Sequence, residues 1–98
     1  FRGDYLKKKT VVITGAGSGL GREAAIELAK RDHSVIATTM YEKQAQEINT
    51  LANDRRIDLK SFKLDINLEN DRNKLKELDF DVLINNAAIG EVQLQIFQ

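Results

Sequence analysis

Several residue types are missing or scarce in this sequence, and each absence excludes a class of structure or chemistry. The 98 residues contain no cysteine, no proline and a single histidine. Without cysteine the chain forms no disulfide and performs no thiolate chemistry, which fits a reducing compartment, so we predict a cytoplasmic protein. The absence of proline excludes a proline-rich linker. Because His33 has no nearby companions and the acidic residues are scattered, we expect no metal site.

Net charge and long apolar runs are also absent. Fifteen basic residues balance fifteen acidic ones, so no overall field attracts nucleic acid or an anionic membrane surface. The longest apolar runs span only a few residues, whereas a membrane helix needs about 20. The charged first residues do not resemble a signal peptide. We therefore expect a globular domain with no nucleic-acid partner and no membrane partner.

Short apolar segments alternate along the chain with segments of helical periodicity. The expected strands are TVVIT (10–14), SVIAT (34–38), KSFKL (60–64) and DVLIN (81–85). The expected helices span about 20–31, 42–53 and 70–78. Because strands and helices alternate, the sequence predicts an α/β fold, a Rossmann-like doubly wound parallel sheet with strand order 3-2-1-4. Residues 1–98 would form the N-terminal part of one such domain, with further parallel strands of a longer protein beside 81–85.

The glycines are concentrated in one segment, TGAGSGLG (14–21), which holds four of the six. In the predicted fold this segment joins the first strand to the first helix, where backbone N–H groups and the helix dipole favour a phosphate. The spacing G-x-G-x-x-G fails because Leu20 holds the third glycine position, and no Lys-Ser or Lys-Thr pair follows as in a Walker loop. The pattern T-G-x-x-x-G-x-G fits. The alternative is a glycine-rich turn needed only for packing.

Three motifs together make the sequence resemble the short-chain dehydrogenase/reductase family. They are TGAGSGLG (14–21), LDI (64–66), which has an aspartate after the third strand, and DVLINNAA (81–88), which is similar to the family's Asn-Asn-Ala-Gly motif. The resemblance covers residues 10–90. It departs from the family at Ala88, where glycine is usual and an added methyl group narrows the space near a cofactor.

The resemblance implies a bound nicotinamide dinucleotide and assigns residues to its parts. Around the pyrophosphate and the adjoining ribose it places Gly15, Gly17, Ser18, Gly19 and Leu20. It makes Asp65 the acceptor of a hydrogen bond from the adenine amino group, with the Ile66 backbone beside it, and it places Asn86, Ala87 and Ala88 under the cofactor's ribose. Two alternatives remain from the residues alone: Asp65 as a strand-end cap or a solvated carboxylate, and Asn85 and Asn86 as partners of backbone groups at a strand end.

The end of the second strand distinguishes NAD from NADP in Rossmann-like folds, because a carboxylate there binds the ribose 2′-hydroxyl and a cation accommodates a 2′-phosphate. We place Thr39 at this position in the segment TTMYEK (38–43). Thr39 is neither acidic nor basic, and its hydroxyl and that of Thr38 would help to bind a phosphate. Glu42 opposes this and Lys43 offsets it. The sequence therefore favours NADP over NAD.

The family's catalytic element, a Tyr-x-x-x-Lys pair on one helix, lies C-terminal to the Asn-Asn-Ala-Gly motif, and this chain ends eight residues after Gly90. Tyr5 and Lys9 have the right spacing, but they precede the first strand, so we assign no catalytic residue to the chain. We expect these 98 residues alone to be inactive and marginally folded.

The resemblance implies that the parent protein transfers a hydride between NAD(P)(H) and a carbonyl or alcohol substrate, and that it is a homo-oligomer. The alternative functions are a noncatalytic dinucleotide sensor and a structural relic that binds nothing.

Overall fold

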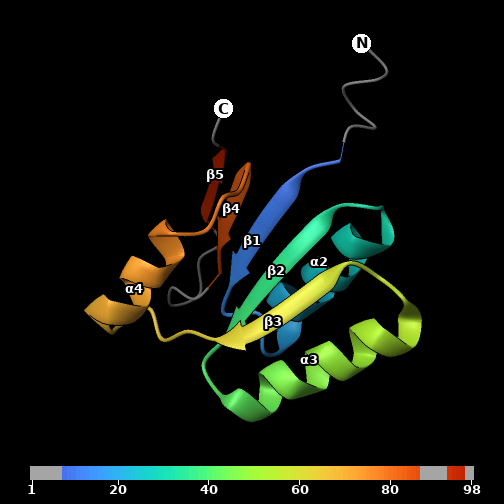
Figure 1. The fold of residues 1–98 in the computed structure, drawn as a ribbon, viewed down its shortest axis with the longest axis horizontal. Coiled ribbons are helices and arrows are strands. Elements are labelled where there is room, and N and C mark those ends of the chain that lie inside the picture. The colour runs from blue at the N-terminus through green and yellow to red at the C-terminus, as the bar shows by residue number, and fades with distance from the viewer. Residues whose placement is uncertain (1–7, 87–92, 97–98) are drawn as a thin grey trace.

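Strands and helices alternate along the chain as the sequence predicts (Figure 1). The structure, a computed structural model, describes residues 8–86 and the backbone of residues 93–96. The elements are β1 (Thr10–Thr14), α2 (Gly19–Lys30), β2 (Ser34–Thr39), α3 (Glu42–Arg55), β3 (Leu59–Lys63), α4 (Glu69–Lys76), β4 (Val82–Asn85) and β5 (Gln93–Ile96). Each predicted strand and helix is present, with ends that differ from the expected ones by at most two residues.

The strands form one sheet in the order β3-β2-β1-β4-β5. β1 pairs in parallel with both β2 and β4, and β2 pairs in parallel with β3. The predicted order 3-2-1-4 is therefore confirmed. In the register, Thr14 pairs with Asn85 and Thr39 pairs with Lys63. These four residues mark the edge where the parallel strands end, which we call the carboxyl edge.

The fifth strand departs from the sequence prediction. β5 runs antiparallel to β4, with Val82 opposite Ile96 and Asn85 opposite Gln93. Within this chain it takes the place beside β4 where we expected parallel strands. The reason is the short connection: only residues 86–92 separate the two strands in sequence, whereas a parallel crossover needs a dozen or more residues.

One face of the sheet is covered by α2 and α3. Alternate strand residues point to this face and pack on small and branched side chains of the two helices. The buried cluster consists of Val11, Ile13, Ala16, Ala25, Ala29, Val35, Ala37, Ile48, Ala52 and Leu59. The alanines of α2 bring its axis close to the sheet, and this positions the N-terminus of α2 directly beyond the end of β1.

The other face lies toward α4, which Figure 1 shows beside β4 and away from α2 and α3. Val82 and Ile84 pack against the buried cluster, so Leu83 between them points to the opposite face. There it lines a hollow of about 390 Å³ together with Leu75, Leu78 and Phe80. Helices on both faces confirm the doubly wound architecture.

The outer strand β3 is covered along its free edge by a side chain. Asn49 of α3 donates from Nδ2 to the Ser61 carbonyl at 2.8 Å, and its Oδ1 accepts from the Ser61 N–H, also at 2.8 Å. One amide group thus forms the two hydrogen bonds that a neighbouring strand would form with Ser61, and it fixes α3 against β3.

Candidate cofactor site

The turn between β1 and α2 needs glycine at two positions because of its backbone conformation. Gly15 has a φ of 64° and Gly19 a φ of 61°, in the left-handed region that other residues rarely adopt. Apart from its chain neighbours and the backbone of its own helix, no atom of the described residues lies within 4 Å of the place where a Gly19 side chain would begin. Gly19 is therefore needed for its conformation, and the space beside it is open.

The other two glycines of the turn allow close packing. A side chain at Gly17 would collide with the carboxamide of Gln44, on α3. A side chain at Gly21 would collide with the Asn86 amide nitrogen and would lie 2.9 Å from the Gly15 carbonyl oxygen. The turn is thus held between α3 on one side and the end of β4 on the other.

The N-terminus of α2 carries no side chain that occupies its backbone donors. Ser18 is the N-cap residue, but its side chain forms no capping hydrogen bond, and the first turn of the helix contains no acidic residue. The first N–H groups of a helix lack partners within the helix, and together with the dipole they attract an anion. The open space at Gly19 lies at this same helix end, so the turn is suited to hold a phosphate group.

A hydrogen-bond network joins the turn to the end of β4. Thr14 donates its hydroxyl to Asn85 Oδ1 at 2.8 Å and accepts from the Asn86 N–H at 3.2 Å. The Asn86 side chain donates from Nδ2 to the Gly15 carbonyl at 3.1 Å. Thr14 is 1% exposed. The Asn86 side chain therefore binds a backbone carbonyl, as the alternative to a cofactor role predicted, whereas the Asn85 side chain accepts from the side-chain hydroxyl of Thr14.

Replacing Thr14 by valine should destabilise the fold by about 2 kcal/mol, because valine keeps the volume but leaves Asn85 Oδ1 and the Asn86 N–H without their partner. Urea denaturation of the full-length protein measures the change. Thr14→Ser is the matched control, since it keeps the hydroxyl and loses only a methyl group, and it should cost about half as much. Equal losses in the two variants would contradict a role for the hydroxyl.

At the end of β2 the structure separates buried from exposed residues. Thr39 is completely buried and donates its hydroxyl to the Tyr41 carbonyl at 2.9 Å. Thr38 is also completely buried, and its hydroxyl has no partner among the described residues. The exposed side chains at this strand end are Met40 and Tyr41. A ligand that reaches the end of β2 therefore meets Met40 before Thr39.

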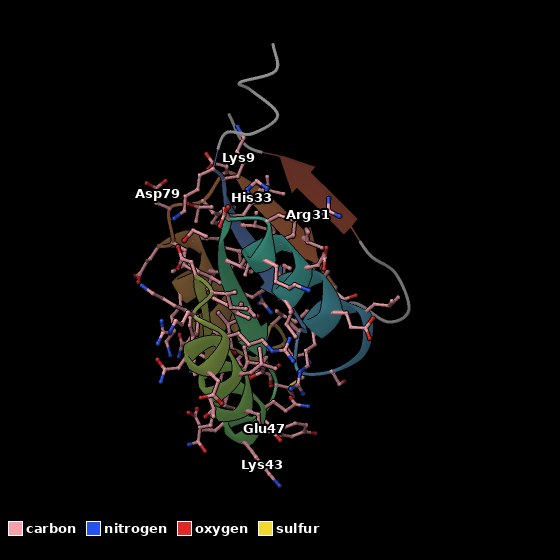
Figure 2. The ribbon with its side chains drawn as sticks, turned by 90° about the vertical axis from the view of Figure 1, so that its right-hand side faces the viewer. Lys9, Arg31, His33, Lys43, Glu47 and Asp79 are labelled. Atoms are coloured by element: carbon pink, nitrogen blue, oxygen red, sulfur yellow. The ribbon has the colours of Figure 1, made fainter. Side chains whose placement is uncertain are left out.

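The cationic candidate beside this strand end points away from the sheet. Figure 2 shows Lys43 and Glu47 extending from α3 into solvent at the lower end of the molecule. Lys43 is exposed, as is Glu42. Neither side chain is fixed in a position that selects one form of the ribose.

Asp65 and Ile66, after β3, lie in a loop that is held by hydrogen bonds. Asp65 Oδ1 accepts from the Asn67 N–H at 2.9 Å. The Asp65 N–H donates to Asp71 Oδ2 at 2.8 Å, and Arg72 donates to the Ile66 carbonyl at 2.7 Å. The Asp65 N–H, followed by the charge of Lys74, holds the pKa of the Asp71 carboxyl below its usual value. Asp71 is therefore a carboxylate at neutral pH.

Four large hydrophobic side chains are exposed around the carboxyl edge. They are Leu20, Met40, Tyr41 and Leu68, with exposed fractions of 75%, 39%, 65% and 54%. Leu20 lies in the first turn of α2, and the other three lie in the segments that lead from a parallel strand to the next helix. Only Leu20 was a candidate from the sequence. The signal for the other three is an apolar residue in a loop, outside the apolar stripe of any predicted helix.

The remaining expectations concern other parts of the chain. Ala87 and Ala88 lie outside the described residues, as does Tyr5. His33 lies at the amino ends of the strands, where its Nδ1 accepts from the Lys9 N–H at 3.1 Å (Figure 2). In residues 8–86 and 93–96, no group of three or more histidine or acidic side chains could hold a metal ion. No helix in this part of the chain has the length and apolar character to cross a membrane.

The fold and its carboxyl edge define a Rossmann-type α/β domain. The profile of the family described as short chain dehydrogenase matches residues 9–97. This chain belongs to the short-chain dehydrogenase family.

Individual relatives agree with this assignment. Retinol dehydrogenase 13 of Mus musculus is 40% identical over 91 residues, which cover 83% of this chain and 27% of the relative. The very-long-chain 3-oxoacyl-CoA reductase of Aspergillus niger is 34% identical over 93 residues, which cover 84% of this chain and 26% of the relative. The chain thus spans about a quarter of the length of these two curated relatives.

A solved structure shows the same fold. The hydroxysteroid dehydrogenase from Escherichia coli superposes with a TM-score of 0.74 and 27% sequence identity, over 82% of this chain and 36% of that chain. The activities in these names belong to the relatives.

Proposed function

We propose that this chain is the dinucleotide-binding half of an NAD(P)-dependent short-chain oxidoreductase. The observation that carries the proposal is the N-terminus of α2, which has no side-chain cap and no acidic residue in its first turn. It follows a glycine turn with open space at Gly19. Glycine turns that end a first parallel strand in this way bind the pyrophosphate of dinucleotides.

Different residues around the carboxyl edge would bind different parts of the cofactor. The pyrophosphate and the adjoining ribose would meet Gly15, Gly17, Ser18, Gly19 and Leu20. Asp65 and Ile66 would hold the adenine, and Asn86, Ala87 and Ala88 would lie under the ribose. Asp65 Oδ1 is already bonded to the Asn67 N–H, so Oδ2 would accept from the adenine amino group.

The bound nicotinamide would supply the hydride chemistry, transferring a hydride to a carbonyl substrate or taking one from an alcohol. The residues of this chain would bind and orient the cofactor. We assign no catalytic residue to them, and we propose that proton transfer belongs to a Tyr-x-x-x-Lys element elsewhere in the full-length protein, which we propose to be a homo-oligomer.

NADP remains the proposed cofactor. A carboxylate at the end of β2 would bind the ribose 2′-hydroxyl and repel a 2′-phosphate. Thr39 is neutral, and so is Met40, which is the side chain exposed beside it. The absence of a carboxylate at both positions supports NADP.

Titration calorimetry of the full-length protein with NADPH and NADH tests the proposal. The proposal is wrong if the protein binds neither of the two. Asp65→Ala should weaken the binding of both cofactors by about 1.5–3 kcal/mol, since one hydrogen bond to a charged acceptor is lost and adenine is common to both. Asp79→Ala is the matched control, because it removes an exposed carboxylate at the opposite end of the molecule (Figure 2). A change in the preference between NADPH and NADH alone would instead place Asp65 near the ribose.

A further inference from the structure

We propose that Asp71 and Arg72 are positioning residues, which hold the Asp65–Ile66 loop in the shape that recognises adenine. The inference rests on the proposed function and extends it to two side chains that act through the loop. In a sequence, charged residues in the first turn of a helix indicate an exposed face, so the sequence predicts no role for Asp71 and Arg72.

The two side chains reach backward from α4 to the loop that precedes it. Asp71 Oδ2 accepts from the Asp65 N–H at 2.8 Å, and the Arg72 guanidinium donates to the Ile66 carbonyl at 2.7 Å. The Asp71 side chain is only 18% exposed, and it also forms an ion pair with Lys74 at 3.5 Å. Two consecutive residues of the helix thus bind two consecutive residues of the loop. Asp71 accepts from the first and Arg72 donates to the second.

The loop's own hydrogen bonds set the direction of the Asp65 carboxylate. Asp65 Oδ1 accepts from the Asn67 N–H at 2.9 Å, and the Asp65 carbonyl accepts from the Leu68 N–H at 3.0 Å. These bonds form a tight turn that ends at Leu68, the N-cap residue of α4, but they do not restrain that turn against the residues within the helix. The contacts from Asp71 and Arg72 supply this second restraint.

Loss of the two contacts from Asp71 and Arg72 should lower the affinity for the dinucleotide by freeing the Asp65–Ile66 loop. A loop without them samples more conformations, and the apparent affinity falls in proportion to the fraction of molecules with the binding-competent loop. Since Asp65 would accept from the adenine amino group, the cost should fall on recognition of that group.

The experiment compares NADH with its deamino analogue, in which hypoxanthine replaces adenine and a carbonyl replaces the amino group. The wild-type full-length protein should bind NADH roughly tenfold more tightly than deamino-NADH, because the hydrogen bond to Asp65 is lost. In Asp71→Ala the affinity for NADH should fall by about fivefold while that for deamino-NADH stays near its wild-type value, so the ratio of the two affinities should fall to about two. Arg72→Ala should change both values in the same direction.

The conservative variant Asp71→Asn separates positioning from general stability. Its side-chain oxygen can still accept from the Asp65 N–H, so the ratio should return to within about twofold of the wild-type value. A merely structural role would weaken both ligands equally and leave the ratio unchanged in Asp71→Ala. An unchanged ratio in both alanine variants would overturn the inference.

The failure of this inference is distinguishable from failure of the proposed function. If the wild-type protein binds neither NADH nor NADPH, the proposed function is wrong; if it binds NADPH alone, the same comparison is made with NADPH and deamino-NADPH. If it binds the dinucleotide and its deamino analogue equally, Asp65 does not recognise the amino group and the inference is wrong as well. A thermal melt of each ligand-free variant identifies any that does not fold, and the Arg72→Ala and Asp71→Asn variants then decide the question.

Discussion

Replacing Gly19 by aspartate is expected to abolish dinucleotide binding by the full-length protein. The free protein has room for the new side chain, because, apart from its chain neighbours and the backbone of its own helix, no atom of the described residues lies within 4 Å of its first carbon position. The carboxylate would then stand at the N-terminus of α2, where the phosphates approach, and it would take up the N–H groups itself and repel the ligand's charge. Titration calorimetry with NADH and NADPH should detect no binding, a loss of at least about a hundredfold.

Gly19→Asn is the matched control for this experiment. Asparagine has almost the size of aspartate and tolerates the left-handed conformation, with a φ of 61° at this position, about equally well. It carries no charge, so it should retain weak binding if repulsion is the main effect. Unchanged affinity in Gly19→Asp, with a normal thermal melt, would contradict the placement of the phosphates.

Gly21→Val should cause the largest loss of stability among these variants, about 3 kcal/mol. Its first side-chain carbon would collide with the Asn86 amide nitrogen and would lie 2.9 Å from the Gly15 carbonyl oxygen and 3.2 Å from the Ala16 α-carbon. The asparagine can move, but the backbone atoms belong to the turn that β1 and α2 share. The hydrogen bond from Asn86 to Gly15 would therefore be lost together with the close packing of α2.

Urea denaturation measures this loss, and Glu23→Val controls for the poor helix propensity of valine. Glu23 is exposed on the same helix, so its replacement should cost less than about 0.7 kcal/mol. Similar losses at the two positions would show that Gly21 is not needed for the approach of helix and strand.

The order of the sheet could be predicted because it depends on features that the sequence carries locally. Apolar strands such as 10–14, alternation with helices and the fixed hand of crossovers leave few topologies open. The bounds of β3 were predicted one residue late: the alternation in LKSFKL (59–64) is compatible with either start, and the strand begins at Leu59 rather than Lys60. β5 was missed because an antiparallel return depends on a pairing partner, which periodicity does not reveal.

Only those parts of the candidate site that a sequence motif marks could be predicted. The spacing of Gly15 and Gly19 predicted the turn, and the structure adds that both have a positive φ. The accessible side chain at the end of β2 could not be predicted, because the pleat decides whether Thr39 or Met40 faces outward and a shift of one residue reverses it. The contacts of Asp71 and Arg72 were hidden because the backward reach of a charged side chain depends on the path of the preceding loop.

The amide group of Asn49 on Ser61 has a consequence for the chain in a crowded solution. A bare outer strand is a template on which another extended segment can add, and this is a common first step toward aggregation. At Ser61 both the N–H and the carbonyl of β3 are already bonded, so an incoming segment would have to break two short hydrogen bonds before it gained any. Self-templated growth of the sheet from the β3 side is thereby blocked at the centre of the strand.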